Sequence, residues 1–269
     1  MKKELKYLVY FDMLFIVLLA MSGLFSGIVS DVVYYLAFII PLFAYFLLLE
    51  KRKIEDARIS VAPNKEAFTL SLYLAAPTVA GVFFIAMLSS LLLSLLGLPT
   101  EAARVESITA PIILSALLPA FFEELLFRFV PLSLFKNKPR RDAIFFSALF
   151  FALAHCDLAK MPYAFFAGAV FATLDILADS IWPSVLLHLF NNSASLLWMR
   201  YGTDIPIAFI AVLLALTVLS LILAAILKGS LFDRVIGILK EKRTQRLTAE
   251  AWLFVTIVIL ITLTEALWK

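Results

Sequence analysis

Long apolar stretches follow one another along almost the whole chain, and they limit the folds it can adopt. Of its 269 residues, 63% are hydrophobic and 16% are charged, whereas about 25% of the residues of a soluble domain are charged. A transmembrane helix needs about 20 consecutive apolar residues. The sequence therefore predicts an all-α, polytopic transmembrane bundle of about eight or nine helices, forming a single membrane-embedded domain over residues 1–269. The expected spans lie near residues 8–29, 32–49, 67–97, 108–135, 143–156, 160–178, 182–199, 205–228 and 250–268.

The basic residues predict the orientation of this bundle, because cytoplasmic loops accumulate Lys and Arg. With a cytoplasmic N-terminus, the inner segments and Lys228 together hold 18 of the 23 Lys and Arg residues. We therefore expect an integral, multi-pass membrane protein with its N-terminus in the cytoplasm. Nine spans would place the C-terminus outside, and fusion of the short fifth span with the sixth would reverse it. The inner segments are residues 2–6, 50–66, 136–142, 175–181 and 229–249.

Two segments allow more specific expectations. The basic N-terminus precedes an apolar run that is longer than the hydrophobic region of a signal peptide, so it predicts a retained signal anchor. Residues 229–249 have apolar side chains at helical spacing and a basic end. They are read either as an amphipathic helix on the inner membrane surface or as a solvated connection. The basic residues are spread over short loops, and we expect no nucleic-acid partner.

The stretch PAFFEELLFRF places three charged side chains in a span that otherwise suits hydrocarbon. Charged groups within a bilayer are costly and usually mark a functional site or a buried pair. Glu124 and Arg128 are four residues apart on one helix face, which predicts an ion pair. Glu123 is rotated by about 100° from Glu124, so it should be free for a different partner.

The chain has only two histidines, His155 and His188, and both follow apolar stretches. Either one alone could simply bridge two helices by a hydrogen bond. A rise of 1.5 Å per residue, however, places Glu123 and His155 each about 20 Å from the loop 136–142, and His188 and Asn192 about 10 and 15 Å from the inner end of their helix. The four side chains should therefore meet at one level, in a polar cavity that opens toward the cytoplasmic side.

These side chains suit hydrolysis of a peptide bond. A carboxylate and an imidazole can hold and deprotonate a water molecule, while a second imidazole and an amide can stabilise an oxyanion. Glu123, His155 and His188 would also make a common catalytic zinc set. Cys156 adjoins His155 and points to a different helix face, so we interpret it as a packing residue.

Three motifs resemble those of a known family. The segments EELLFR (Glu123–Arg128), FALAH (Phe151–His155) and HLFNN (His188–Asn192) match EExxxR, FxxxH and HxxxN. In this order on successive spans they resemble the CPBP (Abi) family, whose best-known members are the type II CAAX prenyl endopeptidases. The resemblance covers residues 108–200 and leaves the flanking helices of 1–107 and 201–269 unmatched. Phe129 and Ala172 stand where many members have glycine, which affects packing and leaves the polar set complete.

The resemblance implies intramembrane proteolysis, with membrane-embedded or lipidated peptides or proteins as substrates. Glu123 would activate the water and His155 would orient it, His188 and Asn192 would form the oxyanion site, and Glu124 with Arg128 would support them. No cofactor is favoured, because Asn192 suits an oxyanion donor better than a zinc ligand; zinc remains the alternative. Two other functions stay open: a proton-coupled transporter, and a non-catalytic scaffold or immunity protein of the same family.

Overall fold

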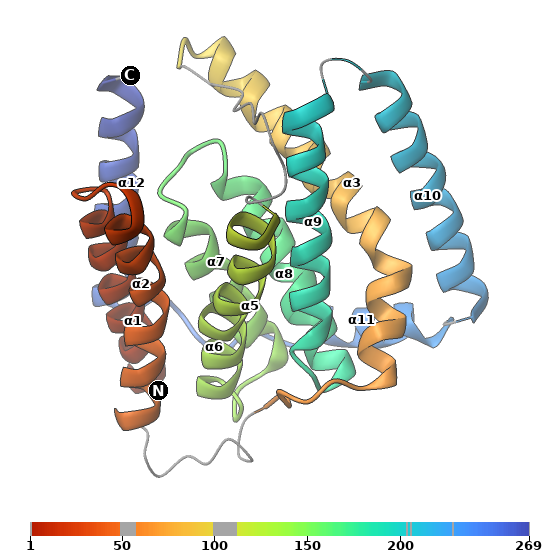
Figure 1. The fold of residues 1–269 in the computed structure, drawn as a ribbon. Coiled ribbons are helices and arrows are strands. Elements are labelled where there is room, and N and C mark those ends of the chain that lie inside the picture. The colour runs from red at the N-terminus through yellow and green to blue at the C-terminus, as the bar shows by residue number, and fades with distance from the viewer. Residues whose placement is uncertain are drawn as a thin grey trace.

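Helices account for the regular structure of the chain in a computed structural model, which describes residues 2–48, 58–98, 112–202, 204, 206–227 and 229–268. They form one bundle, and the two ends of the chain lie at opposite ends of it (Figure 1). Six helices are long and apolar enough to cross a membrane. The all-α transmembrane bundle expected from the sequence is therefore confirmed.

The first two helices, Lys2–Ser22 and Gly27–Leu48, begin five or six residues before the expected spans 8–29 and 32–49. The later helices follow the expected spans to within a few residues, and one additional short helix precedes the last. Between α3 and α7 the chain makes one pass that is built from four consecutive helical pieces. The elements are α1 (Lys2–Ser22), α2 (Gly27–Leu48), α3 (Lys65–Leu95), η2 (Ile112–Leu117), α5 (Leu118–Glu124), η3 (Leu125–Phe129), α6 (Val130–Leu134), α7 (Arg140–Ala154), α8 (Met161–Ala178), α9 (Trp182–Tyr201), α10 (Pro206–Leu227), α11 (Ser230–Leu239) and α12 (Ala249–Trp268).

The pass of η2, α5, η3 and α6 contains two π-helical pieces, which the sequence did not predict. Glu124 ends α5 and directly precedes the second π-helical piece, Leu125–Phe129. Short π-helical insertions are rare and occur frequently at functional sites. Here the π-helical piece begins directly after Glu124 and contains Arg128, which forms an ion pair with Glu124.

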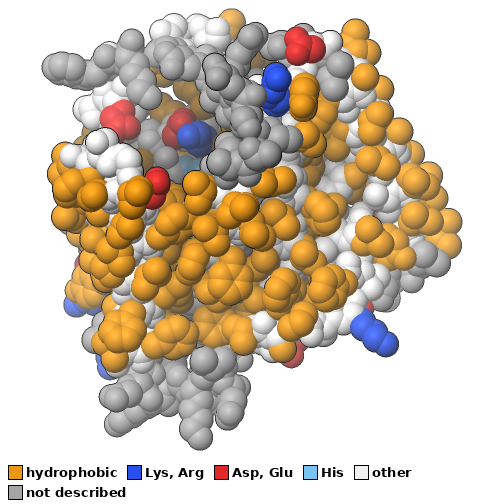
Figure 2. All heavy atoms as spheres, viewed as in Figure 1, with side chains coloured by type: hydrophobic (Ala, Val, Ile, Leu, Met, Phe, Trp, Pro, Cys, Tyr) orange, Lys and Arg blue, Asp and Glu red, His pale blue; other side chains and the backbone are white. Residues whose placement is uncertain are grey.

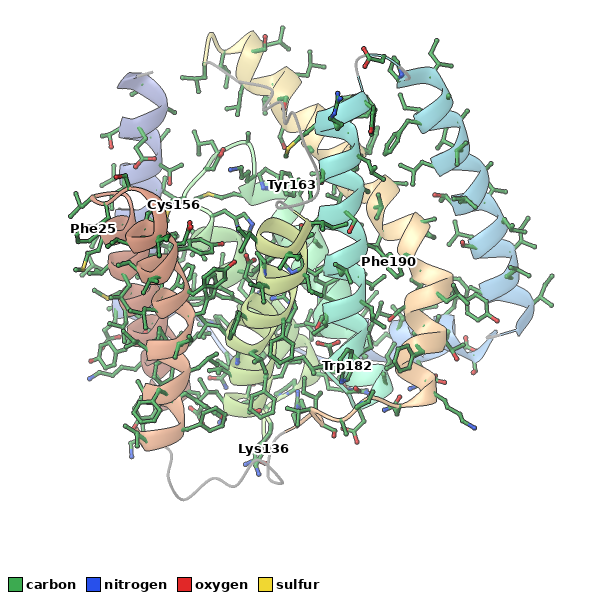
Figure 3. The ribbon with its side chains drawn as sticks, in the orientation of Figure 1. Phe25, Lys136, Cys156, Tyr163, Trp182 and Phe190 are labelled. Atoms are coloured by element: carbon green, nitrogen blue, oxygen red, sulfur yellow. The ribbon has the colours of Figure 1, made fainter. Side chains whose placement is uncertain are left out.

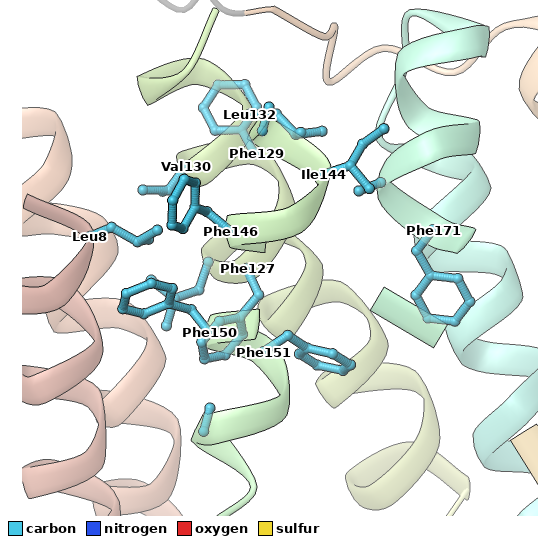
Figure 4. Packing of buried hydrophobic residues seen from close by; sticks show 14 of the residues in the cluster. Leu8, Phe127, Phe129, Val130, Leu132, Ile144, Phe146, Phe150, Phe151 and Phe171 are labelled. Atoms are coloured by element: carbon cyan, nitrogen blue, oxygen red, sulfur yellow. The ribbon is translucent and has the colours of Figure 1, made fainter. Parts of the chain in front are cut away.

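Helix α7 is short and lies among other helices, where most of its side chains are buried. Its closest neighbour is α8. A Cβ atom added to Gly168 of α8 would lie 2.9 Å from the Cα of Ala148 on α7, so the absence of a side chain at Gly168 lets the two backbones approach. Figure 4 shows the aromatic side chains that pack around α7, including Phe127 and Phe151, whose ring centroids are 5.6 Å apart.

The segment 229–249 combines both structures that its sequence suggested. Helix α11 covers its first half and is amphipathic: Leu231 and Ile238 are buried, while Asp233 and Arg234 are exposed. After α11 the chain crosses the N-terminal end of α7 without helical structure, and Asp142 accepts hydrogen bonds there from the backbone and hydroxyl of Thr244, at 2.9 and 2.8 Å. This connection joins α7 to the part of the chain that leads into α12.

Candidate functional site

Glu124 and Arg128 form a fully buried ion pair, as their spacing predicted. Arg128 Nε lies 3.0 Å from Glu124 Oε2, and neither side chain is exposed to solvent. A second nitrogen, Nη1, donates to the Phe127 carbonyl oxygen at 2.9 Å. Removal of one member of a buried pair leaves an uncompensated charge. The pair is therefore a fixed element around which the other polar groups are arranged.

Aromatic rings enclose the guanidinium group of Arg128. Its Cζ lies 4.3 Å from the ring centroid of Phe151 on α7 and 5.6 Å from that of Phe171 on α8. Figure 4 shows these two rings reaching inward from their helices. A cation over an aromatic face is attracted by the ring quadrupole, and more strongly where water is excluded. Phe151 thus connects Arg128 to the histidines, since its ring also contacts those of His155 and His188 at centroid distances of 4.9 and 5.8 Å.

His188 lies between the two glutamates. Its Nδ1 is 2.7 Å from Glu124 Oε1, and its Nε2 is 3.8 Å from Glu123 Oε2. The expectation that Glu124 serves Arg128 alone is thus incomplete, because the carboxylate holds Arg128 with one oxygen and His188 with the other. A carboxylate paired with Arg128 is an acceptor, so Nδ1–H of His188 donates to it. The other face of the imidazole, Nε2, is directed toward Glu123.

His155 stands at the C-terminal end of α7, where the helix stops. Its Nδ1 is 2.8 Å from the carbonyl oxygen of Phe151, and a carbonyl oxygen can only accept a hydrogen bond. The proton of a neutral His155 therefore sits on Nδ1, and Nε2 carries the lone pair. Cys156 follows with a φ of 46° and packs against the hydrophobic core, as a packing residue should.

A cavity of about 750 Å³ lies beside these groups, between α3, α8, α9 and α10. His155, His188 and Asn192 all line it, so the structure brings three of the four proposed catalytic side chains to one space. Glu123 is outside this lining, and its side chain is 15% exposed and adjoins the wall at His188. Figure 2 shows a hollow in the upper part of the molecule with histidine, acidic and basic side chains at its bottom.

Two polar residues that the sequence did not single out belong to the site. Asn191 lines the cavity beside Asn192, and its Oδ1 is buried without a hydrogen-bond partner. Asp175 of α8 is fully buried, and its Oδ1 accepts from the backbone N–H of Ser184 at 2.9 Å. This bond fixes the first turn of α9, one turn before His188. The acidic residue inside the apolar segment FATLDIL was the available signal for Asp175.

The zinc alternative would require three ligand side chains to converge around one ion. Among the described residues, which include Glu123, His155 and His188, no three His, Cys, Asp or Glu side chains converge as a group that could hold a metal ion. Nδ1 of each histidine is engaged with Phe151 or Glu124, which leaves Nε2 as the nitrogen available for other partners.

Residues 105–194 match the family model described as type II CAAX prenyl endopeptidase Rce1-like. The match covers about a third of the chain and includes all three motifs. It confirms the resemblance of this segment to a family of CAAX-protease-like membrane endopeptidases. Neither the curated proteins nor the solved structures include a match to the chain.

Proposed function

We propose that this protein is an intramembrane endopeptidase that hydrolyses a peptide bond of membrane-embedded or lipidated proteins. The observation that carries the proposal is the position of His188 between Glu123 and Glu124, on the wall of a cavity that His155 and Asn192 also line. The match of residues 105–194 to a membrane endopeptidase family supports the same reaction. No feature of the described residues favours the transporter or the scaffold.

Glu123 is the proposed general base. A carboxylate that is not neutralised by Arg128 can take a proton from a water molecule, whose oxygen then attacks the carbonyl carbon of the scissile bond. Because a neutral His155 carries its proton on Nδ1, its Nε2 can accept a hydrogen bond from the same water and orient it. The proton taken by Glu123 is then delivered to the nitrogen of the leaving amine.

His188 and Asn192 are the proposed oxyanion donors. The Nδ1–H of His188 is already given to Glu124, so stabilisation of the oxyanion requires a second proton on Nε2. The carboxylates on both sides of the ring favour such an imidazolium. The amide of Asn192, one helical turn further along α9, can donate to the same oxygen. Glu124 and Arg128 hold His188 in place and take no part in proton transfer.

The proposed mechanism uses no metal ion. A carboxylate and an imidazole suffice to activate water, and the described Glu123, His155 and His188 do not converge as a metal-binding group. We expect the purified enzyme to keep its activity after extensive chelation. A complete loss of activity that is restored only by added zinc would contradict this part of the proposal.

The decisive experiment is cleavage of membrane peptides by the purified protein in detergent or liposomes. Glu123→Gln should abolish cleavage, because the amide cannot accept the proton, and it should leave the thermal unfolding midpoint nearly unchanged. Glu265→Gln is the matched control, since it makes the same chemical change at an exposed position of α12 and should retain activity. Cleavage that persists in Glu123→Gln would refute the assignment of the base.

A further inference from the structure

The two ends of the bundle can be told apart by a set of contacts at one of them. Arg58, just before α3, donates to the carbonyl oxygens of Lys136 and Lys138, at 2.5 and 2.6 Å. Lys138 lies 3.7 Å from Glu4 at the start of α1. These contacts place the start of α1, the approach to α3 and the loop after α6 at the same end, which we call the basic end. Figure 3 shows Lys136 and Trp182 at this end.

The described Lys and Arg residues are distributed unequally between the two ends. The basic end carries most of the Lys and Arg residues, including those around α11: Lys3, Lys6, Arg58, Lys65, Lys136, Lys138, Arg140, Arg141, Arg234, Lys240, Lys242, Arg243 and Arg246. The opposite end has only Lys160 and Arg200 among the described basic residues. Acidic residues occur at both ends, with Glu4, Glu66, Asp142 and Glu241 at the basic end and Asp31, Asp157, Asp204 and Glu265 at the other. Because Lys and Arg accumulate in cytoplasmic loops, we expect the basic end to face the cytoplasm.

The cavity extends from His188 away from the basic end. On α9 its wall continues from His188 to Met199, near the C-terminus of the helix. On α3 it runs from Ala80 to Ser90, although the helix begins at Lys65. Since α3 and α9 both start at the basic end, most of these lining residues belong to their far halves. At a rise of 1.5 Å per residue, Ser90 lies about 37 Å along α3 from Lys65.

Helix α10 leads independently to the same position of the cavity. This helix runs in the opposite sense, from the far end toward the basic end. Its lining residues are Phe209, Ile210, Leu213 and Leu214, all in the first half of the helix. Phe209 packs against Trp198 and Phe83, with ring centroids 5.4 and 5.6 Å apart. Figure 3 likewise shows Tyr163, another lining residue, far from Lys136. Three helices thus place the cavity in the half of the bundle opposite the basic end.

We infer that the site receives its substrates from the side of the membrane opposite the cytoplasm. This inference rests on the proposed function, and it replaces the cytoplasmic opening expected from helix depth alone. The depth count gives distances from the basic loops, and these do not show on which side of the polar groups the cavity lies. The substrates are then membrane-embedded or lipidated segments of proteins that have already crossed the bilayer.

The lining agrees with such a substrate. Between the polar group around His188 and the far end, the wall is mainly aromatic and aliphatic, and isolated polar side chains such as Ser90 and Ser195 interrupt it. An apolar segment can fill this space by burying its own surface. A soluble polar peptide would have to leave its backbone groups without hydrogen-bond partners there.

Cysteine labelling of the full chain in intact cells and in inverted vesicles tests this inference. The native cysteine is removed by Cys156→Gly, and single cysteines are then introduced by Ser195→Cys in the cavity, Ser26→Cys between α1 and α2, and Asn137→Cys at the basic end. Ser26 and Asn137 are exposed positions that report the two sides. A membrane-impermeant maleimide should label Ser195→Cys and Ser26→Cys in intact cells, and Asn137→Cys only in inverted vesicles.

The labelling requires no peptidase activity, so its outcome is separate from that of the proposed function. The same pattern is expected when Glu123→Gln is added. Labelling of Ser195→Cys only from the side that labels Asn137→Cys, or from neither side, would overturn the inference. Labelling of Asn137→Cys in intact cells would overturn it as well, because the basic end would then face outward.

Discussion

Arg128 illustrates how strongly one buried side chain depends on its partner. The guanidinium group is fully buried against Glu124, the Phe127 carbonyl and the ring of Phe151. Arg128→Met keeps much of the side-chain volume but leaves the Glu124 charge uncompensated, so we expect a loss of about 3–5 kcal/mol in the free energy of unfolding. Chemical denaturation in mixed micelles measures this loss.

A double variant separates the two causes of this stability loss, the uncompensated charge of Glu124 and the lost packing of Arg128. Adding Glu124→Gln to Arg128→Met removes the orphaned charge, and the double variant should regain part of the lost stability. It should remain inactive, because an amide in place of the Glu124 carboxylate can hold His188 but does not favour its imidazolium form. If the double variant is less stable than Arg128→Met alone, the ion pair is not the main reason for the instability.

Cys156 occupies a backbone conformation that suits a different residue. Its φ is 46°, in the left-handed region where glycine is unstrained and β-branched residues are genuine outliers. We expect Cys156→Gly to fold with nearly unchanged stability, because relief of strain offsets the lost thiol packing. Cys156→Ile should lose about 1–2 kcal/mol. Thermal unfolding midpoints of the two variants test this, and equal midpoints would show that the backbone can relax here.

The sequence predicted contacts within a helix better than contacts between helices. Helical periodicity alone predicts the ion pair of Glu124 and Arg128. The bond between His188 and Glu124, by contrast, depends on how α9 packs against α5, which a single sequence does not encode in its spacing. Asp175 was missed for the same reason, because its partner Ser184 lies beyond the turn between α8 and α9.

At the scale of elements, the contact between α7 and α8 depends on one glycine. A Cβ atom at Gly168 would approach the Ala148 Cα to 2.9 Å and Phe151 Cδ1 to 3.4 Å. Gly168→Ala should therefore push the helices apart, cost about 1–3 kcal/mol, and reduce cleavage by displacing Phe151 and the adjoining His155. Unfolding and cleavage assays on the same preparation check both effects.

Gly237 of α11 provides the matched control. No atom lies within 4 Å of a Cβ placed there, so Gly237→Ala should keep full activity and gain about 0.4–1 kcal/mol through the lower entropy of the unfolded chain. Similar effects of the two glycine substitutions would show that the close approach at Gly168 is unimportant.

The positions of most helices were predictable, because the thickness of the hydrocarbon layer sets the length of a membrane-spanning helix. From α3 onward the described helices agree with the expected spans to within a few residues. Features that depend on local backbone geometry were not predictable. The π-helical piece Leu125–Phe129 interrupts a sequence with ordinary helical periodicity. Likewise, the apolar spacing of residues 229–249 predicted α11 but not its end at Leu239, where hydrogen bonding to α7 replaces helix formation.

At the scale of the whole molecule, the basic end is also where the C-terminal part is attached. Glu241, after α11, accepts hydrogen bonds from the backbone N–H and the Nε of Arg140 at the start of α7, at 2.7 and 2.6 Å. Together with Asp142 and Thr244, this contact joins α11 and α12 to the part of the bundle that carries the site. The contacts thus lie at the basic end, whereas the cavity lies in the other half of the bundle.

The contact of Glu241 and Arg140 predicts a pH dependence of stability. Partial burial alone would raise the pKa of Glu241, but the hydrogen bonds and the charge of Arg140 outweigh it, and the pKa lies below its ordinary value of 4.5. A lowered pKa in the folded state means that the stabilisation is fully present above pH 4.5 and is lost as the pH falls through the folded pKa. The effect should be modest, because both side chains are partly exposed to water, which weakens an ion pair. Thermal unfolding of the wild type and Glu241→Gln at a series of pH values should therefore give midpoints that differ near neutral pH and converge in acid. A difference that stays constant across the series would mean that the Glu241 charge does not stabilise this attachment.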